Sequence, residues 1–439
     1  MELNLSKDLL DLAKIFAKND AKLYIVGGFV RNAIMGFCET DIDVCSRLKP
    51  DEIEKILDKR KYSVTLVNPK LGTVHIRVKS TDLEYEHTTF RAEDYARGGK
   101  HSPTSVRFVD DIPLDASRRD FSANAIYYDV LSGEIIDYYN GVADIKCRAL
   151  KTVETPEYVF ACDGLRILRL IRIASELNFE IEQHTFDVAK KMVAQLEDIS
   201  QERFNKEIVS VLFADYKYDA IVHPTAHIWG LEKFSELGAW EYVLPKFTQI
   251  VGKNEVRKLY NSEWLNLIKT AQPALRISAF VVDICSYLKI EPSSSIIYAI
   301  LGTGGIMLNK KECERQFKIL SAYTKVKHGE IYSEEHGRIF LQKIDKYSSE
   351  ILALCDLANL GGRLHQISKL MQLDKVPFNL KQLDINGRDI SETYPEIEKQ
   401  YYSQILNKLL NRCAIMPELN RKDLLILEAN NIYREIKKG

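Results

Sequence analysis

The sequence lacks the cysteine pattern of a disulfide-linked or zinc-binding protein. Its eight cysteines include no Cys-x-x-Cys pair and no spacing typical of metal ligands, which indicates reduced thiols in a reducing compartment. Long apolar runs are missing as well: no stretch approaches the roughly 18 apolar residues that cross a membrane. The amphipathic N-terminal segment is interrupted by aspartates, unlike a signal peptide. We therefore expect a cytoplasmic protein with no membrane partner.

An excess of charge of either sign is also absent. The chain has 61 basic and 62 acidic residues and a formal net charge of −1, so binding to nucleic acid would depend on a local basic patch. Hydrophobic residues make up 46% and charged residues 28%, as in globular proteins with a core. At roughly 100–200 residues per domain, 439 residues predict several domains.

The hydrophobic pattern changes near residue 140. Before that point, short apolar or alternating segments predict strands at 23–26, 41–44, 73–79, 85–91 and 125–130. After about residue 150, helical spacing dominates, as in 160–178, 184–197 and 201–214. The change predicts an α+β head followed by an all-helical remainder.

The segment 23–46 combines a strand, two glycines and a helix start. Glycine lets the backbone approach a phosphate closely, and a helix N-terminus presents free N–H groups. We therefore consider Gly27 and Gly28 candidates for binding a nucleotide phosphate, with Arg31 placed to hold a phosphate oxygen. By itself such a turn is weak evidence, because ordinary tight turns have the same composition.

Two aspartates follow on the next predicted strand. Asp41 and Asp43 are two residues apart and should point the same way. Their mutual repulsion calls for a counter-charge, and Mg²⁺ bound to one or two carboxylates and to substrate phosphates supplies it. The pair therefore predicts a metal site for phosphoryl transfer; an exposed acidic strand face is the alternative. We favour Glu86 over Glu84 as a third catalytic carboxylate.

A second polar cluster lies at 115–129. Arg118 and Arg119 precede an apolar segment, and beside a triphosphate they would serve as phosphate ligands. Asp120 and Asn124 would then hydrogen-bond a ribose hydroxyl. Surface ion pairs are the other explanation.

The apolar segment 160–178 carries charges at three-residue steps, which are neighbours on a helix surface. They are Asp163, Arg166, Arg169 and Arg172, all candidates for nucleotide binding. A structural Asp163–Arg166 pair is one explanation. Alternatively, Asp accepts and Arg donates, so the pair matches the amino group and ring nitrogen that cytosine and adenine share. Uracil and guanine would leave buried groups unpaired, at roughly 1–3 kcal/mol each, so the pair would act in place of a template.

Together these segments resemble the class II CCA-adding enzyme and bacterial poly(A) polymerase family, within the polymerase-β-like nucleotidyltransferase superfamily. GGFVRN (27–32) with DIDV (41–44) resembles its first motif, RRDFSANA (118–125) its ribose-selecting motif and DGLR (163–166) its base-selecting motif. The resemblance implies a polymerase-β-like nucleotidyltransferase head, a neck with the base-selecting helix, a body and a tRNA-binding tail. The boundaries we expect are 1–140, 141–215, 216–360 and 361–439.

The resemblance implies a CCA tRNA nucleotidyltransferase, which adds C and A to the tRNA 3′ end from CTP and ATP and releases pyrophosphate. Asp41 and Asp43 would hold Mg²⁺. An A-adding tRNA nucleotidyltransferase and a poly(A) polymerase are alternatives; segment 92–105 resembles the flexible loop that CC-only members shorten. The paired aspartates argue against a non-catalytic RNA-binding relative, and RRDF with the neck segment argues against an enzyme that modifies a small molecule or a protein.

Three positions depart from the family pattern. Asn32 stands where the family usually has Asp, and Cys162 stands where it usually has Glu. Gly164 would cost about 1 kcal/mol relative to Ala inside the predicted helix. The first two changes remove negative charge near the site, so they bear on nucleotide preference more than on the reaction class.

Overall fold

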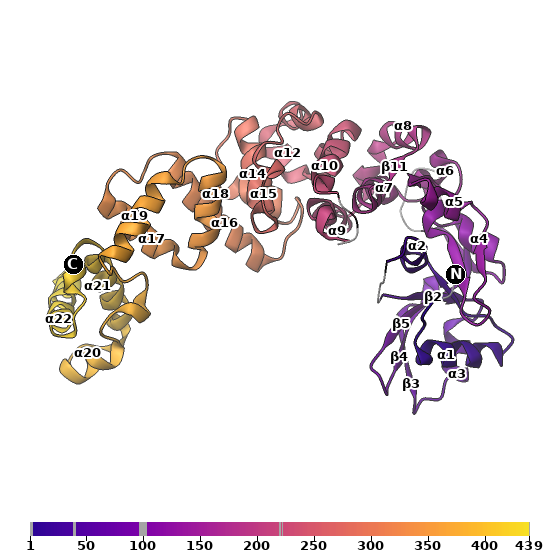
Figure 1. Cartoon of the computed structure of the whole chain (residues 1–439), viewed down its shortest axis with the longest axis horizontal. Coiled ribbons are helices and arrows are strands. Elements are labelled where there is room, and N and C mark those ends of the chain that lie inside the picture. Colours follow the sequence, from indigo (N-terminus) through magenta and orange to yellow (C-terminus); the bar gives the residue numbers. More distant parts are fainter. Residues whose placement is uncertain (1–2, 38–40, 96–102, 219–220, 222, 439) are drawn as a thin grey trace. The chain divides into compact units, whose positions relative to one another are not determined.

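A computed structural model describes residues 3–37, 41–95, 103–218, 221 and 223–438 (Figure 1). Residues 96–102, the centre of the predicted loop at 92–105, lie outside the described residues. The chain divides into two compact units, Met1–Ser262 with Thr303–Met307 and Glu263–Gly302 with Leu308–Gly439. In the parts described, strands occur only before residue 182 and helices make up the rest. The predicted α+β head with a helical remainder is confirmed.

The head is built on a seven-stranded sheet with the order β3-β4-β5-β2-β1-β8-β9. Its strands are β1 Tyr24–Val26, β2 Asp43–Ser46, β3 Tyr62–Asn68, β4 Thr73–Val78, β5 Glu84–Thr89, β8 Ile126–Asp129 and β9 Ile135–Asp137. Neighbours pair antiparallel except β2 and β5, which run parallel. Alternation explains the local fold: in β4, Val74, Ile76 and Val78 are buried while the residues between them are more exposed.

Two short sheets and five helices complete the head. The sheets pair β6 Arg91–Asp94 with β7 Ser105–Phe108, and β10 Ala149–Leu150 with β11 Glu180–Ile181. The helices described are α1 Lys7–Ala17, α2 Gly28–Ile34, α3 Pro50–Ile56, α4 Ile112–Ser117 and α5 Gly141–Lys146. Helix α1 starts where the Ser6 side chain accepts a hydrogen bond from the Leu9 amide.

The rest of the first unit is helical. Its helices are α6 Pro156–Cys162, α7 Leu165–Leu177, α8 Gln183–Lys191, α9 Gln201–Leu212, α10 Ala226–Leu237, α11 Trp240–Val243, α12 Pro245–Val251 and α13 Lys253–Arg257. The almost completely buried helix α7 packs against α9 and α10. The short 3₁₀ segments Ser122–Asn124, Val193–Asp198 and Ala214–Tyr216 connect these elements.

The prediction of one continuous helix over 160–178 is wrong. The chain is extended at Asp163, whose carboxylate accepts a hydrogen bond from the Leu165 amide at 3.0 Å and so starts α7. Gly164 precedes that helix, and a Cβ there would lie 2.6 Å from the Gln195 carbonyl oxygen. Glycine is therefore required by close backbone packing, and the predicted mid-helix cost does not apply.

The second unit is all helical in its described residues. It contains α14 Arg276–Tyr287, α15 Ser294–Leu301, α16 Lys310–Lys327, α17 Glu334–Ile344, α18 Ser348–Leu357, α19 Gly362–Leu373, α20 Gly387–Thr393, α21 Tyr402–Ile415 and α22 Lys422–Lys438. Buried residues such as Ile390, Leu409 and Leu425 join the last three helices in one core. Within the described ranges, no helix is long and apolar enough to cross a membrane.

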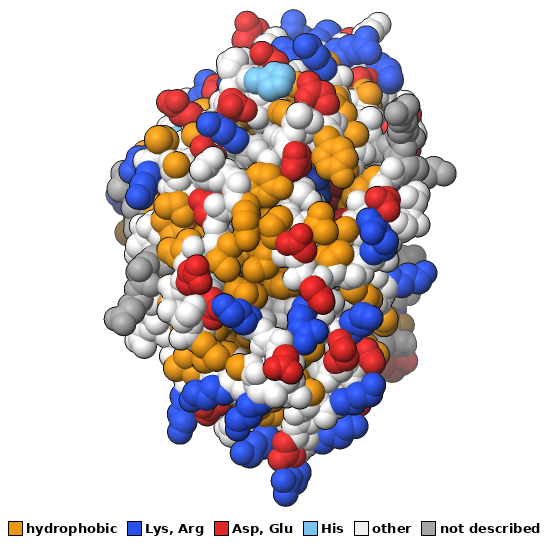
Figure 2. Space-filling model, turned by 90° about the vertical axis from the view of Figure 1, so that its right-hand side faces the viewer, with side chains coloured by type: hydrophobic (Ala, Val, Ile, Leu, Met, Phe, Trp, Pro, Cys, Tyr) orange, Lys and Arg blue, Asp and Glu red, His pale blue; other side chains and the backbone are white. Residues whose placement is uncertain are grey.

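Figure 2 shows basic and acidic side chains interspersed over one face of the molecule, with hydrophobic side chains gathered between them. This mixture agrees with the net charge of −1. A basic site for a phosphate-rich ligand therefore has to be sought in local concavities rather than on this face.

Candidate functional site

A cavity of about 630 Å³ in the first unit collects most of the predicted site residues. It is bounded by the turn after β1, the start of β2, the segment after α4 and the helices α7 and α9. The predicted residues that line it are Gly27, Gly28, Arg31, Asp41, Asp43, Arg119, Asp120, Asn124, Arg169 and Arg172. Residues separated by more than 140 positions in sequence thus share one concave surface.

The glycine turn borders the paired aspartates. Gly27 has φ +82°, a backbone conformation that residues with a Cβ rarely adopt. A Cβ at this position would lie 3.8 Å from Oδ2 of Asp43. The backbone that begins α2 and the Asp43 carboxylate are therefore adjacent, which suits a phosphate held together with a cation.

Asp41 and Asp43 are both exposed and line the cavity, although only Asp43 belongs to β2. Among the residues that the structure describes, no group of three or more His, Cys, Asp or Glu side chains is placed to hold a metal ion. The pair instead fits a hard divalent cation that takes its other ligands from phosphate and water, because such cations are commonly bound by one or two carboxylates.

Glu86 lies directly opposite Asp43 in the parallel pairing of β5 with β2. Its side chain is 3.4 Å from Nε2 of His75 on β4, and His75 Nδ1 is 2.7 Å from Glu84. Glu86 does not line the cavity. The structure therefore places this carboxylate beside Asp43 on the sheet, and its catalytic role stays a prediction.

Arg31 is buried and is oriented by three oxygens. Its Nε donates to Asn32 Oδ1 at 2.9 Å, Nη1 to Asn124 Oδ1 at 2.7 Å and Nη2 to the Tyr218 hydroxyl at 3.3 Å. Because these three acceptors are neutral, they orient the guanidinium without cancelling its charge. Asn32 thus has a structural role beside the cavity: it also donates to Tyr218 from Nδ2 at 3.1 Å.

Asp120 is the buried centre of a second group. Its Oδ2 accepts from Nε and Nη2 of Arg169 at 2.8 and 2.6 Å, and its Oδ1 accepts from Asn124 at 3.1 Å. Burial raises the pKa of this carboxyl, but the charges of Arg169 and Arg166 and the Asn124 hydrogen bond outweigh it and hold the pKa well below its usual range. Asp120 is therefore an anion that fixes one wall of the cavity.

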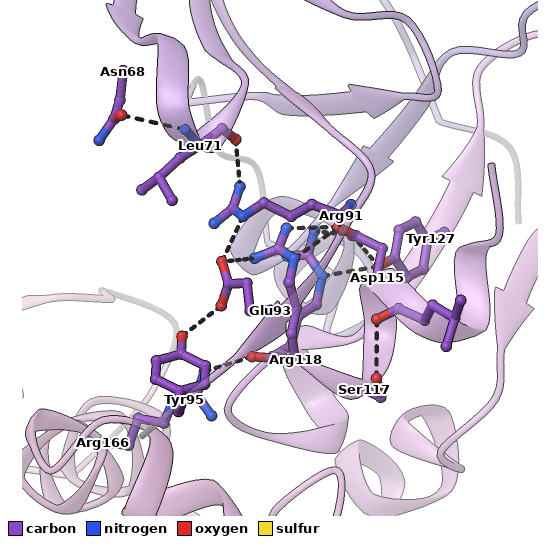
Figure 3. A network of polar contacts seen from close by, with 12 residues as sticks. Asn68, Leu71, Arg91, Glu93, Tyr95, Asp115, Ser117, Arg118, Tyr127 and Arg166 are labelled. Atoms are coloured by element: carbon purple, nitrogen blue, oxygen red, sulfur yellow. Dashed lines mark hydrogen bonds and ion pairs between the residues drawn. The ribbon is translucent and has the colours of Figure 1, made fainter. Parts of the chain in front are cut away.

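Arg118 and Arg119 point in different directions although they are consecutive. Both donate to the buried Asp115, and Arg119 also donates to the Tyr127 hydroxyl at 3.0 Å and lines the cavity. Arg118 instead faces Glu93, 3.9 Å away (Figure 3), and does not line the cavity. Burial raises the pKa of Asp115, but the two arginines and Tyr127 hold it well below the usual value.

Helix α7 supplies the cavity's opposite wall. Arg172 donates to Glu176 at 2.9 Å and to Glu207 of α9 at 2.5 Å, so its charge is balanced by two carboxylates. Burial raises the pKa of Glu176 despite the nearby charge of Arg172. The wall is thus held by buried ion pairs between α7 and α9.

Asp163 and Arg166 lie outside the cavity lining. Asp163 forms an ion pair with Arg203 of α9. Arg166 donates to the backbone carbonyls of Val159 and Arg118 (Figure 3). The adjacent Cys162 is buried, which raises the pKa of its thiol. The structure therefore shows other partners for both predicted base-reading residues, and their role stays a prediction.

Several lining residues were missed by the sequence reasoning. Lys206, Val209, Ser210 and Phe213 come from one face of α9 and its end, and Tyr216, Lys217 and Tyr218 follow. Their spacing of three and four residues marks one helix face, but it does not tell a cavity wall from a solvated face. The stacking of Tyr218 on Phe37, with ring centroids 5.6 Å apart, is a tertiary contact that no local pattern indicates.

Comparison with known proteins agrees with this geometry. Residues 23–151 match the family described as the poly A polymerase head domain. The CCA-adding enzyme of Staphylococcus epidermidis is 37% identical over 194 residues, which cover 44% of this chain and 46% of the relative. The match therefore spans about half the length of such relatives. The CCA-adding enzyme of Ligilactobacillus salivarius is 27% identical over 420 residues, 94% of this chain and 93% of the relative.

The fold extends the likeness over the whole chain. The crystal structure of the Bacillus stearothermophilus CCA-adding enzyme in complex with CTP superposes with a TM-score of 0.68 at 22% identity, covering 98% of each chain. The family resemblance and the fold class predicted from the sequence are confirmed.

Proposed function

We propose that this chain, which has a head similar to the poly A polymerase head domain and the fold of CCA-adding enzymes, is a CCA tRNA nucleotidyltransferase. It would add C and A to the 3′ end of tRNA from CTP and ATP without a template. We expect it to use Mg²⁺ and to act in the cytoplasm. One observation carries the proposal: a single cavity joins Asp41 and Asp43 to the glycine turn and to several basic side chains.

The reaction follows from that geometry. The 3′-hydroxyl oxygen of the RNA attacks the α-phosphorus of the nucleotide and a P–O bond forms. The bond from that phosphorus to the bridging oxygen breaks, and pyrophosphate leaves with its electron pair. Asp41 and Asp43 would hold Mg²⁺, which when bound neutralises phosphate oxygens and favours loss of the hydroxyl proton. Glu86, next to Asp43 in the sheet, is the proposed third carboxylate.

Positive charge around the cavity would stabilise the triphosphate. Arg31 enters from α2 and Arg119 from the segment after α4. Both are held in fixed orientations by hydrogen bonds, so little reorganisation is needed when charge moves to the leaving group. Asp120 and Asn124 line the same cavity, which supports contact with the ribose. Arg118 would act indirectly, through the Asp115 that it shares with Arg119.

Base choice would depend on Asp163 and Arg166. In this proposal they exchange their partners in the structure, Arg203 and two backbone carbonyls, for the pairing edge of cytosine or adenine. Cytosine and adenine fit the acceptor and donor; uracil and guanine do not. The helical parts, including the tail at 361–439, would bind tRNA through its phosphates.

A primer-extension assay with Mg²⁺ tests the proposal. Three tRNA transcripts lacking CCA, ending in C or ending in CC are each incubated with CTP, ATP or both. Extension of all three to one CCA end supports the proposal. Addition of A to the CC-ended transcript alone would make it an A-adding enzyme, and long A tails on unrelated RNA would make it a poly(A) polymerase. No extension of any RNA would contradict the proposed function.

A further inference from the structure

The cavity has a second basic wall on the neck, outside every motif that the sequence singled out. Lys206 lies on α9, and Lys217 and Tyr218 follow the 3₁₀ segment Ala214–Tyr216. All three line the cavity that also contains Asp41 and Asp43. The wall they form, here called the neck wall, therefore faces the carboxylates across the same space.

The two lysines differ from the arginines of the cavity in how their charge is used. Arg119, Arg169 and Arg172 each form ion pairs with carboxylates, namely Asp115, Asp120 and the pair Glu176 and Glu207. Lys206 and Lys217 are exposed. Within the described residues, the ion pairs identified with carboxylates include neither lysine. Their ammonium groups thus provide positive charge that the protein itself has not offset.

Tyr218 attaches this wall to the phosphate-binding side of the cavity. Its hydroxyl accepts hydrogen bonds from Arg31 and Asn32, both on α2, at 3.3 and 3.1 Å. Its ring stacks on Phe37 at an interplanar angle of 16°, and the Lys217 ammonium lies 5.5 Å from the ring centroid. These contacts fix where the chain leaves the neck, and they hold Lys217 next to the Arg31 side of the cavity.

We propose that Lys206 and Lys217 form a phosphate-binding site on the neck wall, which Tyr218 holds against α2. The site takes a phosphate group of the substrates, so the inference rests on the proposed nucleotidyl transfer. That phosphate comes either from the outer phosphates of the nucleotide or from the last phosphates of the RNA. Lysine ammonium groups bind phosphate as point charges, which suits a group that changes position between successive additions.

The test is the double variant Lys206→Ala with Lys217→Ala in the full chain. The matched control is Lys190→Ala with Lys191→Ala, which removes the same charge from the exposed end of α8, outside the cavity lining. KM is measured for CTP at saturating tRNA and for tRNA at saturating CTP, over a range of salt concentrations. A thermal melt of each variant shows whether folding is unchanged.

We expect one of the two KM values to rise about tenfold in the double variant relative to the control, as for loss of hydrogen bonds to charged groups. A rise for CTP assigns the site to the nucleotide. A rise for tRNA, with a salt dependence reduced by about 0.7 per lost single-strand phosphate contact, assigns it to the RNA. If both KM values equal those of the control, the neck-wall site is refuted.

Failure of the proposed function is separable from failure of this inference. If the wild-type chain adds no nucleotide to any RNA, the affinity for inorganic tripolyphosphate is measured by calorimetry instead. A loss of about tenfold in the double variant relative to the control would still support the site. Equal affinity in the two would overturn it.

Discussion

Replacement of Asp120 by Asn tests whether the cavity wall is held by one buried anion. The substitution keeps the size of the side chain but directs N–H donors, or a weaker neutral acceptor, at Nε and Nη2 of Arg169, which now donate at 2.8 and 2.6 Å. Breaking a buried ion pair in this way costs about 3–5 kcal/mol. Because the Arg169 side chain is 34% exposed, solvent screens part of the loss, and we expect about 2–3 kcal/mol.

Hydrogen exchange of α7 amides measures this loss within the first unit, which contains both residues. The control is Asp11→Asn, which removes an exposed pair with Lys14 on α1 and should cost no more than about 0.5 kcal/mol. A loss for Asp120→Asn below about 1 kcal/mol, compared with the 3–5 kcal/mol of a buried pair, would refute the assignment of Asp120 as the anion that holds this wall.

The pH dependence gives an independent check on the same residue. Burial raises the pKa of Asp120, but Arg169 and Arg166 hold it below the usual range. The stabilisation is therefore fully present above the unfolded-state pKa of about 3.9 and is lost as the pH falls from there. The difference between wild type and variant should stay constant from about pH 7 to pH 5 and shrink only at lower pH. A difference that shrinks above pH 5 would contradict this reasoning.

Three further substitutions probe the helix break, base choice and the neck wall. Gly164→Ala should destabilise the first unit by about 1–3 kcal/mol in urea unfolding, because its Cβ would lie 2.6 Å from the Gln195 oxygen; a neutral effect would contradict this. Arg166→Ala should relax discrimination against UTP and GTP about tenfold in a competition assay, and unchanged selectivity would remove its base-reading role. Tyr218→Phe should raise KM for CTP about fivefold without lowering Tm, since the ring still stacks on Phe37; an unchanged KM would argue against its positioning role.

Local patterns predicted the elements that local physics determines. Alternation identified β4 and the buried strand β1 to within a residue or two, and the glycine turn at Gly27 was recognisable because its φ of +82° favours glycine. The aspartate spacing placed Asp41 and Asp43 on one side, and both line the cavity. In each of these cases the determining neighbours lie within a few residues of sequence.

Features that depend on distant partners were not predictable in this way. Arg118 and Arg119 are adjacent in sequence, yet the position of Glu93 on β6 decides which one leaves the cavity. The break at Gly164 depends on the Gln195 backbone. The neck wall depends on the contact of Tyr218 with α2. The sequence contains no local signal for any of these packing partners.

The most direct test of the central claim is the addition of labelled CMP to a tRNA transcript lacking CCA, in the presence of Mg²⁺. Wild type and Asp43→Ala are compared, with Asp51→Ala, an exposed acid on α3 outside the cavity lining, as the control. The account predicts addition by wild type and control, and none by Asp43→Ala with an unchanged circular dichroism spectrum. Addition by Asp43→Ala at the wild-type rate would contradict the claim that this cavity catalyses nucleotidyl transfer.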